Sequence, residues 1–128
     1  MKRILVLRGG ALGDLIVTLP ALALLRRQWP GATIELVGNP TAGQLAVGQG
    51  LVNAVHAQHE RRWSALYGFD PLPAALRTWL DAFDLIVNYW PDPEGELSRR
   101  FPTRPSQRLL STSALPVCAP AAAHYCAP

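Results

Sequence analysis

The feature that most constrains the fold is an alternation of short apolar runs with stretches of helical patterning between residues 3 and 90. Short runs in which nearly every residue is apolar are typical of parallel strands covered on both faces. The alternation therefore predicts an α/β fold, a Rossmann-like open parallel sheet with helices on both faces. The strands are expected at 3–7, 33–37, 52–57 and 84–89, with a possible last one at 107–110. The helices are expected at 14–29, 41–47 and 72–83, with a short one around Trp63.

Two local patterns refine this prediction. In the helix expected at 72–83, residues spaced by four, seven, eight and eleven positions form one apolar face: Leu72, Leu76, Trp79, Leu80 and Phe83. In the first helix, Pro20 predicts either a kink or a restart that Thr18 caps.

A glycine-rich loop, Gly9, Gly10 and Gly13, follows the first expected strand and ends at Asp14, where a helix N-terminus is expected. In open parallel sheets, ligands bind at the carboxyl ends of the strands. A dinucleotide site of the pattern G-x-G-x-x-G is one interpretation, but Arg8 stands where the first glycine belongs. Glu35, the candidate for a ribose-binding acid, lies in the middle of its strand.

Asp14 has two possible roles. A carboxylate beside a glycine loop at the mouth of a cleft can accept a proton from a hydroxyl. The alternative is an N-cap, which stabilises a helix by about 1 kcal/mol. Position alone favours the cap.

The N-terminal sequence resembles that of glycosyltransferase family 9, the ADP-heptose:lipopolysaccharide heptosyltransferases. The resemblance is carried by ILVLR at 4–8, GALGD at 10–14, TLPAL at 18–22 and PGA at 30–32. It is dense to about residue 40, weaker but collinear to about residue 90, and thin beyond.

This resemblance implies a GT-B type glycosyltransferase, of which the chain would be the N-terminal half. Residues 1–110 would form the acceptor-side domain. Seven of the twelve prolines lie between 91 and 128, so residues 111–128 are expected to be a linker toward a C-terminal donor-binding domain absent from this chain. The fragment alone would then be inactive.

The family's proposed catalytic aspartate falls on Asp14, which shifts the preference to a catalytic base. The implied reaction is an inverting, metal-independent transfer of heptose from ADP-heptose to a lipopolysaccharide inner-core acceptor. Gly10, Ala11, Leu12 and Gly13 would lie against the transferred sugar or its phosphates.

Further binding residues are expected after the third and fourth strands. Arg61 and Arg62 would contact phosphates of the acceptor, although a solvated charged loop is an equal alternative. Asn88 and Asp92 would face the cleft mouth, with Asp92 a rival base. Tyr89 and Trp90 can stack on a sugar, but core packing is the more frequent role of such aromatics. His56 and His59 are expected at the surface, without a metal.

Composition bounds the remaining classes of function. Hydrophobic residues make up 49% of the chain and the net charge is only +3, so a nucleic-acid surface is not expected. The apolar runs are too short for a signal peptide or a membrane span, which predicts a cytoplasmic protein with at most peripheral contact at the inner membrane face. Cys118 and Cys126 suggest neither a disulfide nor a metal site.

Two rival functions stay open at this stage: an NAD-type oxidoreductase domain that uses the glycine loop, and a non-catalytic module that binds a sugar or nucleotide. The first predicts NAD binding. The second predicts that Asp14→Asn causes only a modest change, since asparagine caps a helix about as well as aspartate.

Overall fold

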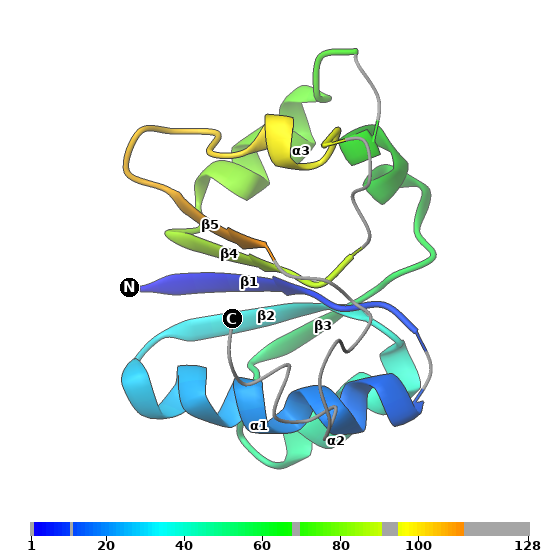
Figure 1. Cartoon of the computed structure of the whole chain (residues 1–128), viewed down its shortest axis with the longest axis vertical. Helices are drawn as coiled ribbons and strands as arrows, with labels where there is room; N and C mark the ends of the chain where they lie inside the picture. The colour runs from blue at the N-terminus through cyan, green and yellow to red at the C-terminus, as the bar shows by residue number, and fades with distance from the viewer. Residues whose placement is uncertain (1, 11, 68–69, 91–94, 112–128) are drawn as a thin grey trace.

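The computed structural model describes residues 2–10, 12–67, 70–90 and 95–111. Its elements follow one another as strands, helices and two short 3-10 helices (Figure 1). In chain order they are β1 (Arg3–Leu7), α1 (Leu12–Gln28), β2 (Thr33–Gly38), α2 (Pro40–Gly48), β3 (Ala54–Ala57), η1 (Arg61–Tyr67), α3 (Ala74–Asp81), β4 (Leu85–Asn88), η2 (Ser98–Arg100) and β5 (Arg108–Ser111).

The five strands form one sheet in the order β3-β2-β1-β4-β5, and every pairing is parallel. The α/β Rossmann-like prediction is confirmed. The chain leaves β1 toward β2 and returns on its other side as β4, so the strand order reverses beside β1. Ligands of open parallel sheets bind at such a reversal, outside the carboxyl ends of the strands. The loop after β1 occupies this position.

Helices α1 and α2 cover one face of the sheet (Figure 1). The core on this face includes Ile4 and Val6 of β1, Ile34 and Leu36 of β2, and Leu22 of α1, all with no exposed surface. These residues alternate along each strand because successive side chains point to opposite faces. Removing this much apolar surface from water supplies the main driving force for the layer.

The opposite face is covered by η1, α3 and η2 (Figure 1). As the periodicity predicted, α3 buries Leu76 and Leu80, and Phe83 is buried directly after it. Trp63 of η1 lies in the same cluster and donates its ring N–H to the backbone oxygen of Ala57, 2.7 Å away. The short helix expected near Trp63 is therefore a 3-10 helix packed on the sheet.

Helix α1 begins two residues before Asp14, so the expected N-cap position for this aspartate was wrong: it lies inside the first turn. The helix runs through Pro20 without a restart, and the Thr18 hydroxyl donates to the Asp14 backbone oxygen at 2.8 Å. Thr18 thus bonds back one turn within the helix instead of capping a new one.

Close backbone packing joins the ends of β1 and β2. The backbone N–H of Arg8 donates to the Val37 oxygen at 3.0 Å, and a Cβ added at Gly38 would stand 2.5 Å from the Arg8 oxygen. Glycine is needed at residue 38 because of this approach, which brings the loop after β1 against the turn after β2.

The segment 112–128, which makes up nearly all of the expected linker, lies outside the described residues. Among the described residues, no helix is long and apolar enough to cross a membrane.

Candidate functional site

Three loops, those after β1, β3 and β4, meet at the carboxyl edge of the sheet. Gly9 and Gly10 belong to the first of them. Gln58, directly after β3, donates its side-chain N–H to the Gly10 oxygen at 3.1 Å. A Cβ at Gly9 would lie 3.0 Å from Gln58 Oε1 and 3.3 Å from the Trp90 ring nitrogen. The glycine loop is therefore held between one side chain that follows β3 and another that follows β4.

Asp14 lies directly against this loop. Gly10 has a φ of +94°, and a Cβ built there would overlap the Asp14 carboxyl group. The missing side chain at residue 10 gives the carboxylate its space, and the left-handed backbone also favours glycine. The Asp14 side chain is 50% exposed. A small hydroxyl-bearing molecule at this edge can therefore reach it.

Arg8 is part of the site, which its place in the sequence did not indicate. Its side chain is only 4% exposed, its Nε donates to the Thr18 hydroxyl at 2.9 Å, and one terminal nitrogen lies 3.4 Å from Asp14 Oδ1. Its guanidinium also lies 6.0 Å from the ring centre of Tyr89. A buried guanidinium stays protonated and only donates hydrogen bonds. Arg8 thus orients the carboxylate and supplies a fixed positive charge at the edge of the sheet.

The two arginines expected to bind an acceptor lie in η1. Arg61 is exposed. Arg62 is partly engaged within the chain: it donates to Glu60 Oε1 at 3.2 Å, and its guanidinium lies over the Trp63 ring at 4.2 Å. Their contact with a ligand stays a prediction.

Asn88 has a clear local role. Its side chain is fully buried, its oxygen accepts from the Trp90 backbone N–H at 2.9 Å, and its nitrogen lies 3.3 Å from the Trp90 oxygen and the Ser111 hydroxyl. These bonds shape the turn after β4 and tie it to β5, which makes the amide a structural group. Its expected role in substrate binding stays a prediction.

Tyr89 is 2% exposed and belongs to the core on the α1 face, while Trp90 is half-buried and stacks on Tyr67 with ring centres 6.4 Å apart. Tyr89 therefore packs in the core, which is the more frequent role of such aromatics.

The remaining expected site residues lie partly in the glycine loop and α1 and partly outside the described residues. Gly10 and Gly13 lie in the loop and in the first turn of α1. Leu12 begins α1. Ala11 and Asp92 lie outside the described residues.

A partly buried polar network crosses the face of the sheet that α3 covers, and no sequence pattern predicted it. Glu35 of β2 accepts from Arg3 of β1 at 2.6 Å and lies 2.8 Å from Nε2 of His56, in β3. The other ring nitrogen of His56 lies 3.4 Å from the Arg62 guanidinium. Since Arg62 only donates, the neutral ring carries its proton on Nε2 and donates it to Glu35.

The surface position expected for His56 was therefore wrong, because this ring is partly buried between Glu35 and the Trp79 side chain, 5.2 Å away between ring centres. His59 is exposed, as expected. Burial raises the pKa of Glu35, but the hydrogen bonds from His56 and Arg3 outweigh it, so that the pKa is lowered from its ordinary value. Glu35 is thus an ionised partner of Arg3 and His56.

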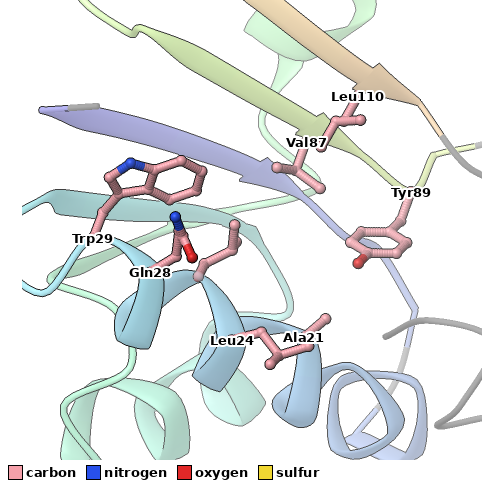
Figure 2. Close-up of a pocket in the computed structure, with 8 residues that line it drawn as sticks. Ala21, Leu24, Gln28, Trp29, Val87, Tyr89 and Leu110 are labelled. Atoms are coloured by element: carbon pink, nitrogen blue, oxygen red, sulfur yellow. The ribbon is translucent and has the colours of Figure 1, made fainter. Parts of the chain in front are cut away.

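A cavity of about 260 Å³ lies between α1 and the strands β4 and β5 (Figure 2). Its walls are almost wholly apolar, with Gln28 the polar exception. Figure 2 shows Ala21, Leu24 and Trp29 on one side, facing Val87, Tyr89 and Leu110 on the other. The cavity lies on the face of the sheet, apart from the group around Asp14, and the described residues that line it include no acid or base.

Comparison with known proteins extends the fold assignment. No family model and no curated protein matches the chain. A structure of a family 9 glycosyl transferase from Veillonella parvula aligns with 98% of this chain at a TM-score of 0.64 and 21% identity. The alignment covers 40% of that protein, so this chain spans well under half of its length. At this identity the likeness establishes a shared fold.

Two structures of the E. coli heptosyltransferase WaaC, one with ADP and one with ADP-2-deoxy-2-fluoro heptose, align with 68% of this chain. They cover 27% and 29% of WaaC at 26% and 27% identity, and the TM-score is 0.47 for both.

Proposed function

We propose that this chain is the acceptor-side part of a glycosyltransferase related to family 9, with Asp14 as the catalytic base. The observation that carries the proposal is the half-exposed Asp14 carboxylate at the carboxyl edge of the sheet, oriented by buried Arg8 and set against the bare backbone of Gly10. The sequence resemblance over residues 1–40 and the fold shared with the Veillonella parvula enzyme support it.

In the proposed reaction, an Asp14 oxygen accepts the proton of an acceptor hydroxyl as that oxygen attacks the anomeric carbon of the donor sugar. The bond from this carbon to the nucleoside diphosphate breaks, the diphosphate leaves with the electron pair, and the anomeric configuration inverts. Gly10 and Gly13 would let the sugar approach within about 3–3.5 Å of the reacting groups. Most contacts to the diphosphate would come from residues outside this chain.

For substrates we propose heptose transfer from ADP-heptose to a phosphorylated lipopolysaccharide inner-core acceptor, at the cytoplasmic side of the membrane. The exposed Arg61 supports an anionic acceptor, since guanidinium groups bind phosphate well. Arg62 would join it by leaving Glu60, with which it forms an exposed ion pair of small energy.

An NAD-binding function receives no support from the described residues. Arg8 fills the position of the first glycine of the dinucleotide pattern and its side chain is buried beneath the loop. Glu35, the only candidate for a ribose-binding acid, is engaged by Arg3 and His56.

The test is an Asp14→Asn substitution in the full-length gene product, assayed with ADP-heptose and a lipopolysaccharide-core acceptor. Loss of a general base is expected to lower kcat by about 10²–10⁴-fold, with the melting temperature nearly unchanged. Asp70→Asn, at an exposed carboxylate outside this group, serves as the control and should keep full turnover. Equal turnover of the Asp14→Asn variant and the wild type would refute the catalytic role.

A further inference from the structure

One hydrogen-bond acceptor and one donor converge on Gly9 at the carboxyl edge of the sheet. A Cβ built at Gly9 would lie 3.0 Å from Gln58 Oε1 and 3.3 Å from Trp90 Nε1. Gln58 directly follows β3, and Trp90 lies two residues after β4. Both side chains are partly exposed. The two polar atoms therefore stand over the same bare backbone, where a small molecule at this edge can meet them together.

The orientation of the Gln58 amide is fixed by the glycine loop. Its side-chain nitrogen donates to the Gly10 oxygen at 3.1 Å. A backbone carbonyl only accepts hydrogen bonds, so the nitrogen has to stand at Gly10 and the oxygen on the side of Gly9. Among the described residues, none donates to this oxygen. Gln58 thus offers a fixed acceptor beside the loop.

The Trp90 indole presents its edge to the same place. The ring stacks on Tyr67, with 25° between the two planes. Its backbone N–H donates to Asn88 Oδ1 at 2.9 Å, which holds the turn after β4. No residue in the described part of the chain accepts from the ring N–H. A partly buried donor without a protein partner gains free energy when a ligand accepts from it.

We propose that Gln58 Oε1 and the Trp90 ring N–H together bind one hydroxyl group of the acceptor sugar. A hydroxyl both donates and accepts, so it can accept from the indole and donate to the amide oxygen at once. An ionised carboxylate only accepts and an ammonium group only donates, so neither satisfies both atoms. The pair therefore selects a neutral, hydroxyl-rich ligand.

The choice of an acceptor sugar rests on the proposed function. Gly9, under the Gln58–Trp90 pair, and Gly10, against the Asp14 carboxyl group, are consecutive in one loop. Their Cα atoms are about 3.8 Å apart, which places both groups within reach of one sugar ring. Gln58 and Trp90 orient the sugar through one hydroxyl, while the proton of another goes to Asp14.

The experiment is a titration of the ¹⁵N-labelled chain with methyl α-D-mannopyranoside, a neutral sugar with adjacent free hydroxyls, followed by NMR. The chain has four tryptophans, so four indole N–H signals are observed. A saturable shift is expected for the signal of Trp90. The signal of Trp63 should stay in place, because its ring N–H is bonded to the Ala57 oxygen.

A matched pair of variants isolates the indole donor. Trp90→Phe keeps an aromatic ring beside Tyr67 but has no ring N–H. Its affinity for the sugar, read at the Gly9 and Gly10 amides, should fall about two- to tenfold, the effect of one neutral hydrogen bond. Trp29→Phe makes the same change at the apolar cavity beside α1. It should bind the sugar within about twofold of the wild type.

Transferase kinetics separate this inference from the proposed function. Trp90→Phe should raise the KM for the acceptor by the same factor and leave kcat within about twofold, whereas Asp14→Asn lowers kcat. A fixed Trp90 signal at the highest sugar concentration overturns the inference and leaves the catalytic proposal standing, and this readout needs no variant. Equal weakening by Trp90→Phe and Trp29→Phe also overturns it. Full turnover of Asp14→Asn beside a shifted Trp90 signal would refute the catalytic role alone.

Discussion

The guanidinium of Arg8 donates its Nε–H to the hydroxyl of Thr18, with the two atoms 2.9 Å apart and both side chains buried. Thr18 in turn donates to the backbone oxygen of Asp14. Arg8, which directly follows β1, is thus tied to α1 one turn beyond the proposed base. The same guanidinium lies 3.4 Å from Asp14 Oδ1, so one side chain contacts both residues.

Replacing Thr18 by valine tests that connection. The substitution keeps the shape but leaves the buried Nε of Arg8 without its hydroxyl acceptor, which is expected to cost about 1–3 kcal/mol of unfolding free energy. Thermal or denaturant unfolding measures the loss. Thr18→Ser, which retains the hydroxyl, should lose clearly less, and equal losses would show that the methyl group matters and the hydrogen bond does not.

Gly10→Ala should impair both stability and turnover. At a φ of +94° an L side chain is strained by about 1–2 kcal/mol, and the new Cβ would displace the Asp14 carboxyl group. Gly13→Ala is the matched change three residues later, in the first turn of α1. Its Cβ would meet nothing within 4 Å, so stability should hold or rise by up to about 1 kcal/mol, as for alanine in a helix. Unfolding and kcat are measured for both variants, and similar stability of the two would contradict the expected strain.

Glu35→Gln should destabilise the chain by about 1.5–3 kcal/mol, because it weakens charged hydrogen bonds to Arg3 and His56 in a mostly buried setting. Denaturant unfolding at neutral pH checks the value. The pKa of Glu35 is lowered in the folded chain, so the difference from the wild type should shrink as the pH falls below the ordinary value of a glutamate. A difference that grows in acid would be inconsistent with an ionised Glu35.

Asp84 offers a second dependence on pH. The Arg104 guanidinium, 2.7 Å away, and the backbone N–H groups of Lys2 and Arg3 lower the pKa of Asp84 to about 2. This carboxylate therefore stabilises the fold above its ordinary value of 3.8, and the gain is lost as the pH falls toward about 2. Asp84→Asn should lower the unfolding free energy by about 1 kcal/mol at pH 7, since water reaches the pair. Unfolding curves of the two proteins should converge near pH 2.

The elements were predictable because each depends on local pattern. Leu76 and Leu80 repeat at helical spacing, and β1 is apolar after Arg3, so the burial of both elements follows from residues close in the chain. The position of Asp14 beside Gly10 also follows from adjacent sequence. Its half-exposed side chain agrees with the position on which the catalytic interpretation depends.

Contacts between distant residues were not predictable in this way. His56 meets Glu35 only because β3 pairs with β2 in a register that a single sequence does not specify. Arg8 was considered as a missing glycine and as part of the family resemblance, whereas its side chain bonds to Thr18 of the following helix. The bonds of the Asn88 amide to Trp90 and Ser111 likewise depend on the turn after β4 and on the pairing of β5, while its expected contact with a ligand stays a prediction.

The tight approach at Gly38 limits how sequences with this fold can diverge. Any side chain at residue 38 has to push back the Arg8 carbonyl, and Arg8 holds both Thr18 and Asp14. A side chain at residue 38, the last residue of β2, would thus be expected to shift the Asp14 carboxylate in α1. Substitution of Gly38 is limited by the lack of space for a side chain and not by the backbone angles of that residue. Through Arg8, the same limit protects the position of the proposed base.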